Sequence, residues 1–225
     1  MMDKIIQVAG IIDSAEAIML MESGVEYLGF PLRLPVNKED LTEEEAAKII
    51  QLIKPPHKAV LITYLNNAEE IIEFCDKLKV TYVQLHGSID INQLKLIKTV
   101  RPEIQIIKSL VIRKDNLYEL ERLVTDMSHW IDLFITDTFD PSTSASGATG
   151  KTHDWNISRK LIELSPKPVI IAGGLNPGNV REAILFTRPA GVDVHTGIES
   201  SNGRKDYLLT SRFIEECNRA FSELK

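Results

Sequence analysis

Three features that many proteins depend on are scarce or absent in this sequence. It has 2 cysteines in 225 residues, and neither Cys75 nor Cys217 has a His or Cys partner at metal-ligand spacing, so we expect both to be reduced, structural thiols. No apolar run reaches the ~18 residues of a membrane span, and the N-terminus lacks the apolar core of a signal peptide. We therefore predict a cytoplasmic protein with no membrane partner.

An excess of basic residues is also missing. The chain has 26 Lys and Arg against 32 Asp and Glu, a net charge of −6. Proteins that bind nucleic acids present a basic face, so we expect no nucleic-acid partner. A small phosphorylated substrate remains compatible with this charge, because a few backbone amides are enough to hold one phosphate.

What the sequence does contain is a regular alternation of short apolar runs and longer amphipathic stretches. The apolar runs are continuous, which is typical of parallel strands that are buried on both faces. The predicted strands are Ile5–Ala9, Tyr27–Phe30, Lys58–Thr63, Tyr82–Leu85, Gln105–Leu110, Leu133–Thr136, Val169–Ala172 and Gly191–Val194.

Capping-box patterns mark the first two predicted helices. Asp13 and Glu16 have this spacing before Ala17–Met21, and Thr42 and Glu45 have it before the helix that ends near Ile53. The remaining predicted helices are Asn67–Leu78, Ile91–Val100, Leu117–Val124, Ser158–Leu164, Asn179–Phe186 and Tyr207–Leu224.

Eight strand–helix units in one chain of this length predict a single-domain (β/α)8 TIM barrel over residues 1–225. The alternative is an open, doubly wound sheet, and no linker or change of composition divides the chain. A barrel carries its chemistry at the C-terminal ends of its strands. That rule selects Ala9, residues 33–38, Tyr64, His86, Lys108, Asp137, Gly173, Gly174, His195, Thr196 and Gly197.

Two of these strand ends predict a phosphate site. Gly173 and Gly174 follow the seventh strand, and Thr196 and Gly197 follow the eighth. Glycine lets backbone amides approach an anion closely, and the loops after strands seven and eight form the usual phosphate site of this fold. The alternative is that these residues simply form tight turns.

Asp137 ends the sixth predicted strand, where burial would raise its pKa and suit it to act as a general acid. A carboxylate that caps nearby amides is the alternative. The loop that follows resembles a nucleotide-binding P-loop at Gly150 and Lys151, but the first glycine of that pattern is replaced by Ala145. We therefore expect no ATP site.

Taken together, the motifs resemble the phosphoribosylanthranilate isomerase family over nearly the whole chain. The residues that carry the resemblance are Val83-Gln84-Leu85-His86-Gly87, Asp137-Thr138, Gly150-Lys151-Thr152-His153-Asp154-Trp155, Ala172-Gly173-Gly174-Leu175-Asn176-Pro177-Gly178-Asn179-Val180 and Val192-Asp193-Val194 with Gly197 and Glu199.

This resemblance implies an Amadori rearrangement of a 5-phosphoribosylamine in tryptophan biosynthesis, without a metal or organic cofactor. It implies that Asp137 is the general acid and that the amides of Gly173, Gly174, Thr196 and Gly197 hold the phosphate. Gln84 and His86 would contact the substrate, and Lys38 or Arg33 would contact its anthranilate carboxylate. We expect a monomer or a homodimer.

The first strand departs from the family motif, in which a Lys-Ile-Cys-Gly segment supplies the general base. Here the segment is Gln7-Val8-Ala9-Gly10, and alanine cannot accept a proton. His195 could replace the base, because the eighth strand lies beside the first in a closed barrel and histidine titrates near neutral pH. Its alternative roles are a polar ligand contact and a histidine satisfied by its neighbours. The wider alternatives are an isomerase or lyase for another phosphorylated sugar or amine, and a non-catalytic phospho-ligand-binding protein.

Overall fold

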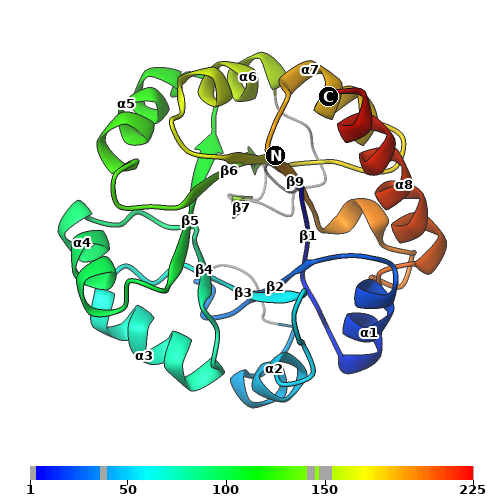
Figure 1. The fold of residues 1–225 in the computed structure, drawn as a ribbon, viewed down its shortest axis with the longest axis horizontal. Coiled ribbons are helices and arrows are strands. Elements are labelled where there is room, and N and C mark those ends of the chain that lie inside the picture. The colour runs from blue at the N-terminus through cyan, green and yellow to red at the C-terminus, as the bar shows by residue number, and fades with distance from the viewer. Residues whose placement is uncertain (1–3, 36–39, 141–144, 147–153, 225) are drawn as a thin grey trace.

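A closed barrel of parallel strands, surrounded by a ring of helices, forms the structure (Figure 1). The computed structural model describes residues 4–35, 40–140, 145–146 and 154–224. Its barrel strands are β1 (Ile5–Ala9), β2 (Tyr27–Pro31), β3 (Lys58–Thr63), β4 (Tyr82–Leu85), β5 (Gln105–Ile112), β6 (Leu133–Asp140), β8 (Val169–Ile171) and β9 (Gly191–Val194). The outer elements are α1 (Ser14–Glu22), α2 (Glu43–Ile50), α3 (Ala68–Leu78), α4 (Ile91–Val100), α5 (Leu117–Met127), α6 (Trp155–Leu164), α7 (Val180–Thr187) and α8 (Tyr207–Glu223).

The strand pairing excludes the open sheet. The strands follow one another in the order β5-β4-β3-β2-β1-β9-β8-β6, and a further pairing of β5 with β6 closes the ring. All of these pairs are parallel, and Gln7 on β1 lies in register with Asp193 on β9. The predicted (β/α)8 barrel is confirmed, and the C-terminal ends of its strands form one common mouth.

Two apolar clusters show which strand residues point inward. The inner cluster contains Ile5 and Ala9 of β1, whereas Ile6 and Val8 belong to the larger cluster between the strands and the helices. Successive side chains on a strand alternate between its two faces. Gln7, which lies between Ile5 and Ala9 in this alternation, therefore also points into the barrel.

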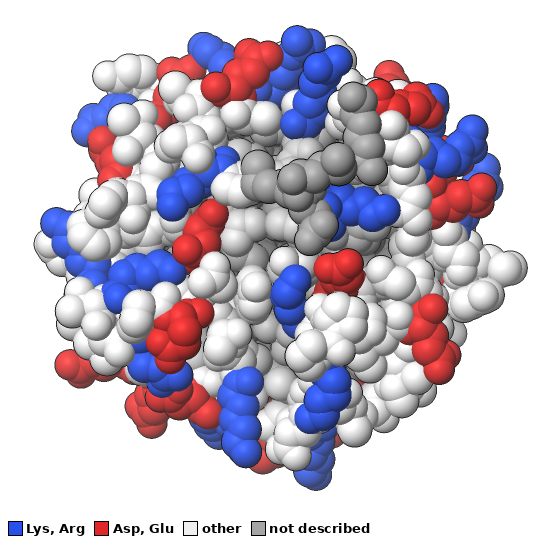
Figure 2. Space-filling model, in the orientation of Figure 1, with Lys and Arg blue, Asp and Glu red and all other residues white. Residues whose placement is uncertain are grey.

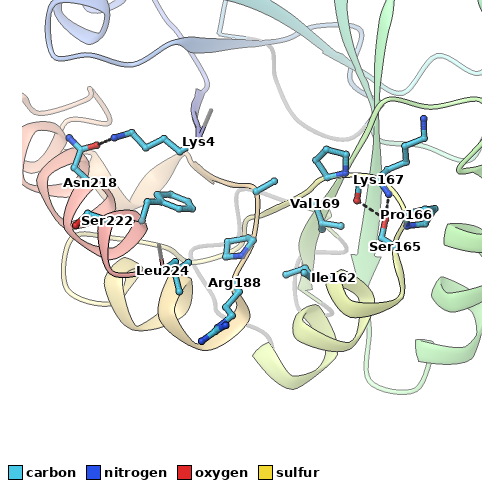
Figure 3. Close-up of a pocket in the computed structure, with 14 residues that line it drawn as sticks. Lys4, Ile162, Ser165, Pro166, Lys167, Val169, Arg188, Asn218, Ser222 and Leu224 are labelled. Atoms are coloured by element: carbon cyan, nitrogen blue, oxygen red, sulfur yellow. Dashed lines mark hydrogen bonds between the residues drawn. The ribbon is translucent and has the colours of Figure 1, made fainter. Parts of the chain in front are cut away.

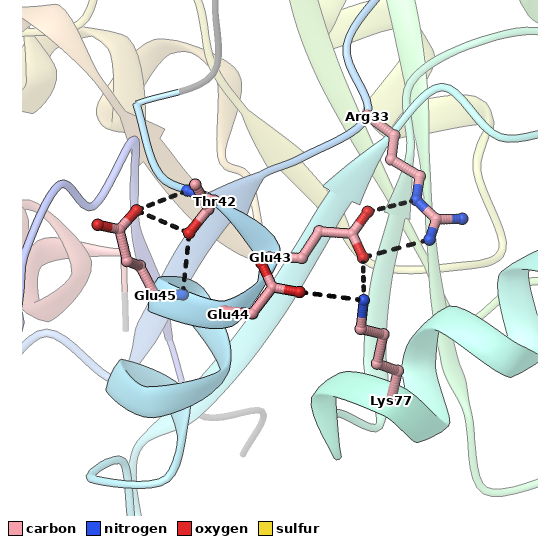
Figure 4. Close-up of polar contacts among 6 residues, drawn as sticks. All are labelled: Arg33, Thr42, Glu43, Glu44, Glu45 and Lys77. Atoms are coloured by element: carbon pink, nitrogen blue, oxygen red, sulfur yellow. Dashed lines mark hydrogen bonds and ion pairs between the residues drawn. The ribbon is translucent and has the colours of Figure 1, made fainter.

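The two predicted capping boxes have different outcomes. Thr42 and Glu45 form the complete reciprocal box at the start of α2 (Figure 4). Asp13 caps α1 by accepting a 2.8 Å hydrogen bond from the Glu16 amide, but the Glu16 side chain does not bond back to Asp13. Glu16 instead accepts from the amides of Ile12 and Lys205, because it is buried where the chain before α8 brings an amide donor to it.

Strands β5 and β6 extend beyond their predicted ends. Their pairing continues through Val111 with Asp137 and Ile112 with Thr138, and β6 then pairs in antiparallel fashion with the short strand β7 (Ala145–Ser146). Asp137 consequently lies within β6, where strand geometry fixes its direction. It points inward, since Ile135 of the same strand belongs to the inner cluster.

Both cysteines are buried, whereas charged side chains of both signs lie on the surface (Figure 2). Cys75 and Cys217 are free and buried, and burial raises the pKa of each thiol to about 12. Figure 2 shows blue and red side chains interspersed around the ring of helices on the face in view. Within the described part of the chain, no helix is long and apolar enough to cross a membrane.

Candidate active site at the barrel mouth

Asp137 is the carboxyl group of β6 that faces the barrel interior. Its Oδ1 accepts a 2.7 Å hydrogen bond from the Thr138 amide, and its Oδ2 lies 3.7 Å from Nε2 of His86. Burial raises the pKa of Asp137, while His86 and the Thr138 amide oppose part of this rise. The carboxyl group therefore both caps an amide and holds a proton more strongly than an exposed aspartate, which combines the two roles considered from the sequence.

His86 and Gln84 project from β4 and its end toward the same interior. The Tyr64 ring packs edge-on against His86 with 4.8 Å between ring centroids, and burial with the nearby Asp137 charge raises the pKa of Tyr64 to about 12. Gln84 accepts a 2.8 Å hydrogen bond from Gln7 across the barrel. These contacts form a buried polar layer beneath the mouth.

A second inward carboxyl group, Asp193 on β9, was not selected from the sequence as a site residue. It is 8% exposed, and its Oδ1 has no hydrogen-bond partner among the described residues. Burial, followed by the charge of Asp137, raises the pKa of Asp193 to about 7, while Gln7 and Lys205 oppose the rise. A polar residue inside an apolar strand, two positions before the selected His195, is the signal that could have identified it.

The turn after β8 is held in a conformation that favours glycine. Gly173 and Gly174 have φ values of +92° and +64°, and the carbonyl of Gly174 accepts a 3.0 Å hydrogen bond from Asn179. Neither glycine amide donates to another of the described residues. The turn is therefore braced through its carbonyl group, and its amides remain available to a ligand.

The turn after β9 packs directly against this first turn. It begins the short 3₁₀ helix η1 (Thr196–Ile198). A Cβ atom on Gly197 would lie 1.8 Å from the carbonyl oxygen of Leu175, so the two turns can adjoin only because residue 197 is glycine. The structure thus brings the four residues selected for phosphate binding, Gly173, Gly174, Thr196 and Gly197, to one place.

His195 lies over the end of β1, but its electrostatic surroundings do not suit a base. A Cβ atom on Gly10 would overlap its ring, at 2.1 Å from Nε2. Nε2 lies 3.5 Å from Glu199, which forms a 2.6 Å ion pair with Lys205. Burial and the Lys205 charge lower the pKa of His195 to about 3. The imidazole is consequently neutral and weakly basic near pH 7, which fits either of its alternative roles, a polar ligand contact or a histidine satisfied by its neighbours.

Arg33, expected to contact a substrate carboxylate, lines a hollow at the mouth and is paired with Glu43 in the structure. Its Nε lies 2.8 Å from Glu43 Oε1, and its guanidinium stacks on Phe74 at 3.9 Å from the ring centroid. Figure 4 shows Glu43 held between Arg33 and Lys77. One edge of the guanidinium is thus paired with a carboxylate of the chain, and its contact with a substrate carboxylate stays a prediction. Lys38, the other candidate, lies outside the described residues, as does the loop containing Gly150 and Lys151.

Lys108, selected as a strand end, lies on the outer side of β5 and not in the mouth. Its strand neighbours Ile107 and Ser109 alternate with it, and Ile107 belongs to the inner cluster. Its Nζ donates to the carbonyls of Leu85, Gly87 and Ser109 at 2.9–3.1 Å, and burial lowers its pKa to about 8. Lys108 therefore fixes the backbone on both sides of His86.

Two hollows lie at opposite ends of the barrel. A groove of about 800 Å³ is lined by residues that directly precede the strands, including Lys4, Lys167 and Arg188. Figure 3 shows Lys167 and Arg188 pointing away from each other and Lys4 bonded to Asn218, so these charges do not converge on a ligand. The second hollow, of about 450 Å³, lies between the loops after β2, β3 and β4, at the end that carries the polar layer.

Comparisons with known proteins agree with this geometry. A sequence model described as N-(5'phosphoribosyl)anthranilate (PRA) isomerase matches residues 6–216. N-(5'-phosphoribosyl)anthranilate isomerase 2 of Methanosarcina mazei is 34% identical over 98% of this chain and 96% of its own length. Among the residues described, no group of three or more His, Cys, Asp or Glu side chains could hold a metal ion.

Solved structures are similar to the whole barrel. Monomers generated from the dimeric phosphoribosylanthranilate isomerase of Thermotoga maritima superpose with a TM-score of 0.79 at 27% identity, covering 96% of this chain and 100% of that one. A complex of such an isomerase with reduced 1-(o-carboxyphenylamino)-1-deoxyribulose 5-phosphate has a TM-score of 0.79 at 25% identity and the same coverage.

Proposed function

The chain belongs to the N-(5'-phosphoribosyl)anthranilate isomerase family, and we propose that Asp137 and the two glycine turns carry out that reaction here. The observation that supports this assignment best is the arrangement of neighbouring strands. The turns after β8 and β9 adjoin, and β6, which carries Asp137, pairs with β8. A phosphate on the turns would therefore place the attached sugar beside the acid.

Asp137 is the proposed general acid for ring opening. Because burial raises its pKa, its carboxyl group retains a proton at a higher pH than an exposed aspartate does. It donates that proton to the furanose ring oxygen as the bond from this oxygen to C1 breaks. The lone pair of the anthranilate nitrogen then forms the C1=N bond, which gives an open-chain iminium ion.

The phosphate is proposed to bind the amides of Gly173, Gly174, Thr196 and Gly197. The positive φ values of both Gly173 and Gly174 and the asparagine bond to the Gly174 carbonyl support a cradle formed before the ligand arrives. Such preorganised amides bind an anion without a basic side chain. This arrangement is compatible with the chain's negative net charge of −6.

The anthranilate group is proposed to lie on the opposite side of the mouth. The hollow between the loops after β2, β3 and β4 includes Tyr64 and Gly87 in its lining, and it lies across the barrel from the turns after β8 and β9. Gln84 and His86 border the path between the two ends. Lys38 is the proposed partner of the anthranilate carboxylate, and His195 is a proposed polar contact near the phosphate.

We further propose a cytoplasmic enzyme that acts as a monomer or homodimer on a small phosphorylated substrate, without nucleic acid or membrane. The free, buried cysteines support a reducing compartment. The Thermotoga maritima relative, described as dimeric, supports a homodimer as one of the two states. No cofactor is needed for the acid and base steps.

The experiment that tests this function measures turnover of N-(5'-phosphoribosyl)anthranilate by the purified chain, from the loss of anthranilate-type fluorescence. Binding of the reduced product analogue is measured in parallel by calorimetry. We expect micromolar or tighter binding and measurable turnover. An Ala9→Cys variant, measured beside the native chain, should turn over at least tenfold faster if residue 9 is the limiting feature. Absence of both binding and turnover would contradict the proposal.

A further inference from the structure

The rearrangement needs a proton acceptor as well as an acid, and β1 does not supply one. Its inward side chains are Ile5, Gln7 and Ala9, and none of them can take a proton at neutral pH. The acceptor must remove the hydrogen on C2 of the open-chain iminium ion. It must therefore lie near the centre of the mouth, between the phosphate and anthranilate ends.

The neighbouring histidines are poorly suited to this step. His195 is neutral and weakly basic, because burial and Lys205 disfavour its charged form. His86 faces the acid, with its Nε2 at 3.7 Å from Asp137, and its ring packs against Tyr64. In that position His86 interacts with Asp137, the carboxyl group that is already assigned to ring opening.

Asp193 lies one inward residue pair beneath the position of the missing acceptor. It lies in register with Gln7 on the adjoining strand, and Ala9 is the next inward residue of β1 toward the mouth. Asp193 is more than nine-tenths buried, yet its Oδ1 has no partner among the described residues, which is a costly state unless a ligand group approaches it.

The charged groups around Asp193 favour a proton acceptor that works near neutral pH. Asp137 faces it from β6 and raises its pKa, while Lys205, before α8, acts in the opposite direction. From β1 it meets the uncharged amide of Gln7. The resulting pKa of about 7 lies where a general base combines adequate basicity with a populated ionised form. Two buried carboxyl groups in one site can thus divide the acid and base roles.

We propose that Asp193 is the catalytic base of this chain, taking the proton from C2 of the iminium ion formed by Asp137. This inference rests on the proposed function. The Asp193 carboxylate binds the C2 proton, the C2–H electron pair becomes the C1=C2 bond, and the C1=N electron pair returns to nitrogen. The enaminol then gains a proton at C1 and loses its O2 proton, which yields the ketone. Protons are redistributed, and no electrons are gained or lost overall.

A double-mutant cycle at positions 9 and 193 tests this proposal. Asp193→Asn keeps the shape of the side chain and removes its basicity, so we expect kcat to fall about 10²–10⁴-fold in the native background. In the Ala9→Cys background a thiolate can take the proton, so the same substitution should change kcat less than tenfold. Circular dichroism melts of all four proteins show whether each is folded.

Each other outcome of the cycle overturns the proposal. Equal losses in both backgrounds would assign Asp193 a structural role, and an unchanged native kcat would exclude it as the base. Turnover in Ala9→Cys with none in the native chain would refute the role of Asp193 as the base but not the proposed function. Absence of turnover in both would refute the proposed function, and Asp193 with it.

A Gln7→Lys variant adds a readout that a structural role would not move. A cation beside Asp193 should stabilise the carboxylate and lower its pKa. The acid limb of the kcat profile should then shift to lower pH by at least one unit, whereas a limb that stays in place contradicts the assignment. Gln7→Met, which removes the Gln7 amide without adding a charge, is the matched control and should not shift the limb downward.

Discussion

The two sides of the barrel mouth are built in different ways. On the side of β6, β8 and β9, backbone turns adjoin through Gly197, and the buried carboxyl groups Asp137 and Asp193 point inward. On the side of β2 and β3, the well-placed cation Arg33 is bound to Glu43 and stacked on Phe74. The first side directs backbone turns and carboxyl groups toward the mouth, whereas on the second side the arginine forms an ion pair within the chain.

This difference shows where specificity can change without loss of the fold. Backbone amides and strand residues are fixed by the barrel itself, so the proposed phosphate and acid functions would follow from its construction. Contacts to the anthranilate group depend on loop side chains, which can pair with each other instead. The variants below test this division from the largest expected effect to the smallest.

Asp137→Asn should lower turnover as strongly as Asp193→Asn does. The amide cannot donate the proton that ring opening requires, so we expect kcat to fall about 10²–10⁴-fold while binding of the product analogue changes little. Steady-state kinetics and calorimetry measure the two quantities. Asp132→Asn, at the other end of β6 beside Lys98, is the control and should retain native kcat; equal losses in both variants would contradict the acid role.

Gly197→Ala should damage the phosphate side specifically. The added methyl group would meet the Leu175 carbonyl oxygen at 1.8 Å, which forces the two turns apart. We expect KM to rise at least tenfold, with a loss of about 1–3 kcal/mol in the free energy of unfolding. Gly24 has φ +92°, and a Cβ atom added there would meet nothing within 4 Å, so Gly24→Ala should lose stability without a change in KM. A native KM for Gly197→Ala would refute the cradle.

Asp193→Asn should stabilise the protein at neutral pH even as it slows the reaction. An unfolded aspartate releases its proton near pH 3.9, whereas folded Asp193 retains it up to about pH 7. Between these values the folded state binds more protons, so native stability falls as pH rises. We expect the variant's Tm to exceed the native Tm by at least about 2 °C at pH 8, with a gap that narrows toward pH 4.

Asp13→Asn is the control for this stability effect, with the opposite sign. A hydrogen bond from the Glu16 amide lowers the pKa of Asp13, so its ionised form stabilises the folded state above the unfolded pKa. Thermal melts at several pH values should show a lower Tm for Asp13→Asn near neutral pH. A higher Tm for both variants would mean that the stabilisation by Asp193→Asn is not specific to the burial of Asp193.

Arg33→Met should have the smallest effect. Its ion pair with Glu43 is partly exposed, at 38% and 22% of the two side chains, and such pairs contribute at most about 1 kcal/mol. We expect KM to stay within twofold of the native value, as it should in the matched variant Glu43→Gln. A tenfold rise in KM for Arg33→Met alone would show that the arginine leaves Glu43 to bind the anthranilate carboxylate.

The sequence by itself determined the barrel and predicted where its chemistry lies. Continuous apolar runs such as Ile5–Ala9 identify strands because burial on both faces leaves a local pattern. The regular alternation with helices identifies the parallel barrel, and the strand-end rule then selects Asp137 and the glycine turns without any coordinates. The barrel prediction succeeds because each of its elements depends on residues that are close together in the chain.

The tertiary structure decided which selected groups are available and how they titrate. The Glu16 side chain accepts a hydrogen bond from the Lys205 amide instead of completing the capping box. Arg33 is bound to Glu43, and burial makes His195 a weak base. Asp193 became a candidate through burial and the charge of Asp137, which lies far from it in sequence. Solvent exclusion and charge act through space, so only the folded arrangement of the strands fixes them.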